Sequence, residues 1–250
     1  MEQGLHITLA AERLFNVWGF PITNATLAMW LVTAVLVVVG VLVGRRPSLI
    51  PGKVQNAFEM LFEYLLGLYE QTLESRRLAV RYFPFITTLF LFIVAANLLG
   101  FLPIYGTLQL VRGEEHAALF HPSTADLNTT LALAIISFVV IELSGILTLG
   151  VLKYSSKFIT IQAGVMGFIV GLLELVGNVA RLVSFSFRLF GAIFAGEVLL
   201  LVVGTFVPYF LPVPLMAFEA FIGVLQAAIF AILTLAFIKI AIQEPHTASH

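Results

Sequence analysis

The sequence contains no cysteine and few charged residues. Its 250 residues include 13 Lys or Arg and 14 Asp or Glu, so that 11% of the chain is charged, whereas soluble domains carry about 25%. Without cysteine, the chain forms no disulfide, thiolate metal site or cysteine nucleophile. A net charge of −1 and the lack of a basic stripe argue against a nucleic-acid partner.

A nucleotide-binding loop is also missing. No G-x-x-x-x-G-K-[ST] pattern occurs, so we expect the chain itself to bind no nucleotide and to catalyse no nucleotide chemistry. The histidines fall in predicted loops and tails, and we expect no metal ion and no cofactor.

Apolar residues, by contrast, are abundant. They make up 60% of the chain, and the mean hydropathy is +1.04. Disordered chains have low hydrophobicity, and a soluble fold of this size would need more charge. The composition therefore predicts a protein that lies in the lipid bilayer and crosses it several times.

Stretches without charge locate the membrane segments. Residues 14–44 and 82–111 carry no charge, and residues 127–152 carry only Glu142. Because a transmembrane helix needs about 20 apolar residues, the sequence predicts an all-α polytopic membrane protein that forms a single domain over residues 1–250. The predicted membrane segments lie near 26–43, 83–103, 128–151, 161–206 and 214–240.

The last two segments differ from the others in length. A proline-rich break at Pro208, Pro212 and Pro214 separates them, which predicts an antiparallel hairpin. Each is longer than a perpendicular crossing requires, so we expect both to be strongly tilted or broken.

An amphipathic stretch follows the first membrane segment. The region near 53–76 predicts a helix on the cytoplasmic membrane surface, either as a simple connector or as a contact for a partner. The apolar residues that recur at helical spacing are Val54, Ala57, Phe58, Leu61, Phe62, Leu65 and Leu68.

Basic residues predict the orientation, since they are enriched on the cytoplasmic side. The predicted topology puts Arg13 and Arg112 on one side, and a larger group on the other. We therefore expect the amino terminus outside and the carboxyl terminus in the cytoplasm. The larger group consists of Arg45, Arg46, Lys53, Arg76, Arg77, Arg81, Lys153, Lys157 and Lys239.

The charges inside the fourth and fifth segments are the candidate functional residues, because a charge at membrane depth costs about 2.5–3.5 kcal/mol on insertion scales. At helical spacing, Arg188 shares a face with the polar residues before it, and Glu197 lies about half a turn away from Arg188. In the hairpin, the residue numbers of Arg188 and Gln226 add to 414, and those of Glu197 and Glu219 to 416. The residues on the face of Arg188 are Glu174, Asn178 and Arg181.

This pattern predicts an arginine–glutamine level and a pair of carboxylates nearer the outside. Carboxylates gain and lose protons, whereas an arginine keeps its proton. Arg188 would thus be a barrier between two proton paths, and a carboxylate on another subunit would carry protons past it. The alternative is that these charges pair with one another and only hold the helices together.

The segment SFSFRLFGAIFAGE, residues 184–197, resembles the signature of subunit a of the F-type ATP synthase. Weaker similarities follow the same order along the chain: the residues 52–59, ANLLGFLP at 96–103, STADLNTT at 123–130 and LQAAIFAILT at 225–234. The resemblance implies a stator subunit of the membrane sector, with two offset half-channels and two long tilted helices beside a ring of c subunits.

The resemblance also implies roles for individual residues. Arg188 matches the essential arginine that faces the c-ring carboxylates, and Gln226 the glutamine that faces this arginine. Glu142 matches no position with an implied role. The outer path would contain Glu197, Glu219, Asn97, Asp126 and Asn128, and the cytoplasmic path Glu174, Asn178 and Arg181.

Some of these residues also have simpler structural explanations. Asp126 can cap the following helix, and Asn97 can form a hydrogen bond between helices. Two positions depart from the family pattern. Ala192 stands where the family usually has Asn, and both Glu197 and Glu219 are acidic where many relatives place one His.

The resemblance further implies the partners and location. We expect the c-ring, b-type peripheral stalk subunits and the lipid bilayer as partners, the proton as transported ion, and a bacterial inner membrane as location. A self-contained secondary ion transporter is the alternative, but the inverted repeats typical of that class are not visible. A purely structural scaffold would leave the arginine motif unexplained.

Overall fold

The computed structural model describes residues 13–17, 19–45, 52–101, 108–112, 115–151, 154, 164–207 and 210–243. In these residues, five helices are long and apolar enough to cross a membrane, which confirms the prediction of an all-α polytopic protein with about five membrane segments. They are α1 (Asn24–Gly44), α3 (Arg76–Leu99), α5 (Leu127–Leu149), α7 (Gly164–Phe206) and α8 (Pro212–Ile242).

Some predicted boundaries shift. The helix α2 (Lys53–Leu73) ends before the predicted 76, and α3, which begins at Arg76, contains most of the membrane segment predicted near 83–103. The reason is that Glu74, between the two helices, adopts a left-handed conformation with φ of 54°, which ends α2. Two predicted segment ends, 103 and 161, lie outside the described residues. The same holds for four residues named in the sequence analysis: Arg46, Lys153, Lys157 and Pro208.

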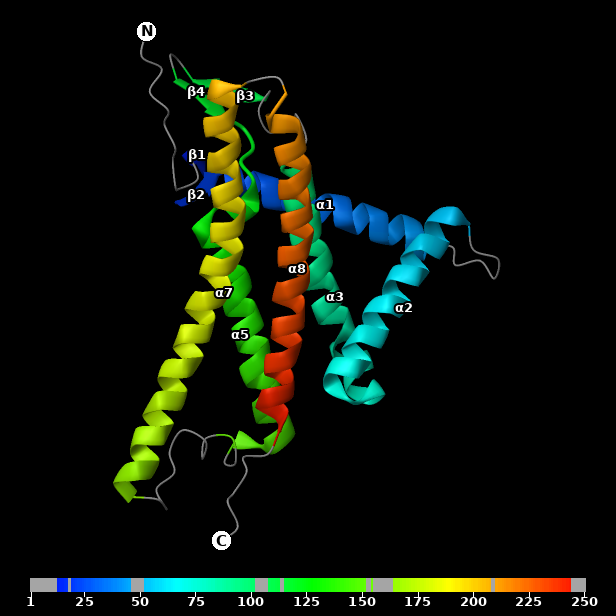
Figure 1. Cartoon of the computed structure of the whole chain (residues 1–250), viewed down its shortest axis with the longest axis vertical. Coiled ribbons are helices and arrows are strands. Elements are labelled where there is room, and N and C mark those ends of the chain that lie inside the picture. The colour runs from blue at the N-terminus through cyan, green and yellow to red at the C-terminus, as the bar shows by residue number, and fades with distance from the viewer. Residues whose placement is uncertain are drawn as a thin grey trace.

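Four helices form the main bundle. α3, α5, α7 and α8 run side by side, and α7 and α8 are the longest of them (Figure 1). The interior of the bundle is apolar: Ile86 and Ile93 of α3, Leu189 of α7 and Leu235 of α8 are each fully buried. Extensive exposed apolar surface remains on the outside, as expected for helices that face lipid.

α1 takes a different direction. Its first half packs against the bundle through Ala25, Ala28 and Val32, whereas Val37, Val38 and further residues of its second half are exposed. Figure 1 shows α1 leaving the bundle at a large angle to α8. All five helices therefore cannot stand upright in one bilayer, and some must be tilted.

α7 and α8 form the predicted antiparallel hairpin. The rings of Phe185 and Phe230 are in contact, with their centroids 5.0 Å apart, and Gly196 lies against Glu219. The residue numbers of each contact add to 415, so one register holds along the hairpin. α7 contains no proline, and the prolines of α8 lie in its first turn, where a missing N–H leaves no hydrogen bond unmade.

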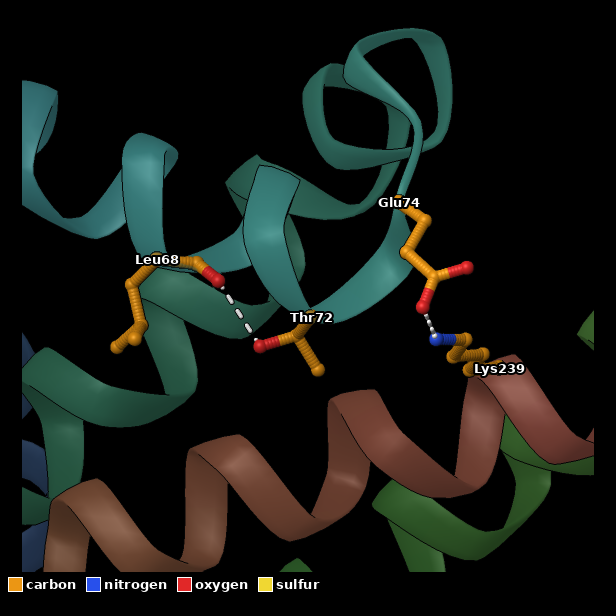
Figure 2. Close-up of polar contacts among 4 residues, drawn as sticks. All are labelled: Leu68, Thr72, Glu74 and Lys239. Carbon is orange, nitrogen blue, oxygen red and sulfur yellow. Dashed lines mark hydrogen bonds and ion pairs between the residues drawn. The ribbon is translucent and has the colours of Figure 1, made fainter.

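α2 packs against α3 and α8 with its second half. Leu65, Tyr69 and Leu73 are buried there, while Val54 near its start is 66% exposed. Only part of the predicted apolar face is therefore covered by this chain. At the end of α2, Lys239 of α8 donates a hydrogen bond to Glu74 at 2.9 Å, which joins the two helices (Figure 2).

Two short hairpins were not predicted. β1 (Arg13–Val17) pairs with β2 (Phe20–Thr23), and β3 (Gln109–Arg112) pairs with β4 (Glu115–Ala118), both antiparallel. β3 and β4 lie at the end of the bundle where α7 ends and α8 begins (Figure 1). A short 3-10 turn, η1 (Ser123–Ala125), is buried against α1, α3, α5 and α7.

Candidate functional site

Arg188 lies on the exposed side of α7. Its guanidinium donates a hydrogen bond to Ser184 one turn earlier, at 3.3 Å. In the part of the chain that the structure describes, no carboxylate forms an ion pair with it. The surface around Arg188 combines apolar side chains, such as Phe187 at 57% exposure, with the small exposed residues Ala180 and Ala195.

Gln226 lies at the same level of the hairpin but faces inward. Its side chain is 7% exposed, and its amide nitrogen has no hydrogen-bond partner among the described residues. No hydrogen bond joins Gln226 to Arg188 in that part of the chain. The arginine–glutamine level therefore stays a prediction, and within the described residues the two side chains are not bonded to each other.

The two outer carboxylates lie at one level. The Glu219 side chain is 6% exposed, and it lies so close to Gly196 that a Cβ atom there would be 2.5 Å from Glu219 Oε1. Glu197 is the next residue on α7. The contact with Gly196 therefore puts the Glu219 side chain against the α7 backbone, at the level of Glu197.

His121 joins this pair from a different element. Its Nδ1 atom is 4.0 Å from Glu197 Oε1, and the imidazole is 23% exposed. Sequence reasoning missed this contact because His121 is more than 70 residues from Glu197 and lies in a connection without regular structure. Its place two residues before the segment STADLNTT, residues 123–130, is the sequence feature that could have indicated it.

Asn97 and Asp126 are both buried, and each forms hydrogen bonds within the chain. Asn97 Nδ2 donates to the Gly223 carbonyl at 2.8 Å, which joins α3 to α8. Asp126 caps α5: its Oδ1 accepts from the backbone N–H of Asn128 at 3.3 Å and from the Asn128 side chain at 3.2 Å. Asn128 itself is exposed.

Several buried polar atoms have no hydrogen-bond partner among the residues that the structure describes. They are the oxygens Asn97 Oδ1, Ser123 Oγ, Thr124 Oγ1 and Glu219 Oε2, together with the Gln226 amide nitrogen. Buried polar groups are rarely left without a hydrogen bond, and ordered water commonly supplies it. The side of the bundle between η1, α3 and α8 is therefore suited to hold water.

A second polar cluster lies toward the other end of α7. Asn178 is buried, and its Oδ1 accepts a hydrogen bond of 2.7 Å from Arg181. Asn178 in turn donates to Glu142 of α5 at 3.3 Å. Arg181 also lies over the Phe237 ring, 5.0 Å from its centroid. Glu174 is half-buried one turn before Asn178.

The carboxyl groups among these residues belong to a class that binds and releases protons. The described residues contain no cluster of three or more His, Asp or Glu able to hold a metal ion. The arrangement consists of a carboxylate cluster at each end of α7 and an arginine between them on the exposed face.

The fold and these charges define a class: a polytopic membrane protein with ionisable groups at membrane depth, a combination typical of ion pathways. Comparison with known proteins gives the family. The family model of the ATP synthase A chain matches residues 26–239. The chain belongs to this family.

Individual relatives agree over most of their length. The chain is 33% identical to ATP synthase subunit a 2 of Syntrophotalea carbinolica over 97% of this chain and 94% of the relative. It is 35% identical to ATP synthase subunit a of a Campylobacter jejuni strain over 86% and 89%. The corresponding protein of Geotalea daltonii is 32% identical over 87% and 86%.

Proposed function

We propose that this chain is the stator of a rotary proton motor, with two offset half-paths that load and unload carboxylates on a ring of c subunits. As a member of the ATP synthase subunit a family, it is a proton-translocating subunit of the membrane sector. The proposal adds how the protons pass and which residues carry them.

The single observation that carries the proposal is Arg188. A charged side chain at membrane depth costs about 2.5–3.5 kcal/mol, and within the described residues this arginine has only the Ser184 hydroxyl as partner. An exposed, unneutralised arginine on a membrane helix needs an anion from outside the chain. A small exposed residue on the same face, Ala195, would let another helix approach closely. A ring helix with a carboxylate fits both features.

The outer half-path runs past Glu197 and Glu219, with His121 beside Glu197. The buried polar atoms without protein partners support a hydrated route in this region. Asn97, Asp126 and Asn128 line it in our proposal, although Asp126 and Asn128 also form the α5 cap. Gln226 lies at the level of Arg188 but faces inward, so in our proposal it bonds to the arginine after one of the two side chains turns toward the other.

The cytoplasmic half-path runs past Glu174, Asn178 and Arg181. Protons that enter from outside load a ring carboxylate, travel with the ring, and leave on this side. Arg188 prevents direct passage between the two paths, because it repels a migrating cation and does not give up its own proton. This assignment assumes the amino terminus outside and the carboxyl terminus in the cytoplasm.

The remaining partners follow from the same proposal. We place the chain in a bacterial inner membrane, with b-type peripheral stalk subunits holding it against rotation. Nucleotide chemistry belongs to other subunits of the complex. The length of α7 fits this arrangement, since 43 residues extend about 65 Å, against a hydrocarbon core of about 30 Å. The helix must therefore lie strongly tilted, along the circumference of a ring.

The test is ATP-driven proton pumping in inverted vesicles that contain the assembled complex. We expect Arg188→Ala to abolish pumping while the complex still assembles. Arg181→Ala is the comparison variant, because its cation lies on the same helix but is bonded within the chain; we expect it to pump more than Arg188→Ala. Normal pumping by Arg188→Ala would refute the proposal and leave the charges as structural pairs or as parts of a transporter of another kind.

A further inference from the structure

Glu142 is a carboxylate within a membrane helix for which the sequence indicates no role. Both of its oxygens accept hydrogen bonds: Oε2 from the Tyr154 hydroxyl at 2.6 Å, and Oε1 from Asn178 at 3.3 Å. Asn178 also accepts a hydrogen bond from Arg181 at 2.7 Å. A continuous series of hydrogen bonds therefore connects α7, α5 and Tyr154, which lies five residues after the end of α5.

Tyr154 is held firmly in this series. It is 7% exposed, and its ring lies so close to Gly145 of α5 that a Cβ atom there would overlap it. Burial and the hydrogen bond to Glu142 raise the pKa of Tyr154. Its hydroxyl therefore stays protonated at neutral pH and donates to Glu142.

Hydrogen bonding alone does not account for a carboxylate at position 142. A Gln side chain could also bond to Tyr154 and Asn178, without the cost of a charge in a membrane helix. Moreover, no Lys, Arg or His nitrogen of the described residues lies within ion-pair distance of Glu142. Arg181 bonds to Asn178 instead. The distinctive property of a carboxylate in this place is that it can accept and release a proton.

We propose that Glu142 is a proton-accepting residue of the cytoplasmic half-path, which crosses from Glu174 and Asn178 on α7 to α5 and ends beside Tyr154. This inference rests on the proposed function. A proton leaves a ring carboxylic acid, Glu142 binds it and becomes neutral, and Glu142 then releases it to water on the cytoplasmic side. Tyr154 keeps its own proton and orients the carboxylate.

The first test compares Glu142→Gln, Glu142→Asp and Tyr154→Phe in the assembled complex. Because proton-transfer groups commonly contribute a hundredfold or more, we expect Glu142→Gln to pump at least about tenfold more slowly than wild type. Glu142→Asp, which keeps the carboxylate, should restore part of the rate, and Tyr154→Phe should lose less than Glu142→Gln. Equal rates for Glu142→Gln and wild type, or for Glu142→Gln and Glu142→Asp, would overturn the proposal.

The second test measures access from water and does not depend on pumping. Since the chain has no cysteine, Glu142→Cys provides one reactive group in it. We expect silver ions added on the cytoplasmic side to react with Glu142→Cys but not with Val139→Cys, which lies about one turn away on an exposed apolar part of α5. Equal reactivity would overturn the proposal.

The outcomes also separate this inference from the proposed function. If Arg188→Ala pumps normally, the proposed function fails. If Arg188→Ala is inactive and Glu142→Gln is fully active, only the role of Glu142 fails.

Discussion

Glu219 occupies its position because residue 196 is glycine. The buried carboxylate fills the space where any other side chain would begin, and this brings it to the level of Glu197. Small residues between membrane helices allow this kind of close approach. At the residue scale, the outer carboxylate pair therefore depends on a residue that carries no charge.

This dependence can be tested with Gly196→Ala. The new Cβ would lie 2.5 Å from Glu219 Oε1, so the carboxylate must move. Because a proton-transfer group contributes about a hundredfold or more only when it is correctly placed, we expect the displacement of Glu219 to lower ATP-driven pumping by about tenfold. The control is Gly204→Ala in the same helix, where a Cβ meets nothing within 4 Å. Similar rates for both variants would contradict this account of Gly196.

Sequence reasoning predicted part of this geometry. The antiparallel register placed Glu197 and Glu219 at one level because two long helices joined by a short break have few alternative pairings. The same reasoning could not find His121 or the bonds of Glu142. His121 and Tyr154 lie in connections between helices, and helical periodicity does not predict where such connections run. In addition, Tyr154 reaches Glu142 only because Gly145 leaves room for its ring.

At the scale of elements, α2 shows how an amphipathic helix is fixed to a membrane bundle. Tyr69, on its buried face, is 1% exposed. Its hydroxyl and that of Thr87 on α3 lie close enough to interact, but neither has a well-formed hydrogen bond. Burial raises the pKa of Tyr69 above its usual value of 10.0.

This shift predicts a pH dependence. A group whose pKa is raised in the folded state stabilises that state fully below its unfolded pKa, and the contribution is lost as the pH rises through the folded pKa. The Tyr69→Phe variant lacks this ionisable group. When the pH is raised from about 8 to about 11, its unfolding temperature should therefore fall less than that of wild type. At the lower pH we expect no loss, since the buried hydroxyl lacks a good partner.

The measurement is the thermal unfolding of the detergent-solubilised complex. Tyr64→Phe is the matched control, because Tyr64 lies on the same helix but is 70% exposed. We expect Tyr64→Phe to follow wild type across this pH range. A Tyr69→Phe variant with the alkaline instability of wild type would show that Tyr69 does not ionise on unfolding.

The elements themselves were predicted with different success. Long apolar segments without charge define their helices clearly, and α1, α5, α7 and α8 lie close to the predicted ranges. The break between α2 and α3 was not predicted, because a left-handed residue at Glu74 leaves no signal in the spacing of apolar residues. The strands were missed because four or five residues show too little alternation.

At the scale of the whole molecule, the fold distributes charge unevenly. Carboxylates and amides are enclosed at both ends of the α7–α8 hairpin, while Arg188 between them is exposed. The large angle between α1 and the bundle (Figure 1) agrees with long helices that lie inclined in the membrane. In our account, the chain forms both half-paths, and the carboxylates of the rotating ring connect them.

The central claim is that Arg188 separates two half-paths that are connected only by rotation. The most direct measurement is passive proton flux, driven by an imposed membrane potential, through complexes whose ring is cross-linked to the stator. With the ring locked, we expect no flux in wild type and a measurable leak in Arg188→Ala, since the charge that blocks direct passage is gone. A locked Arg188→Ala complex that stays as tight as wild type would contradict the account.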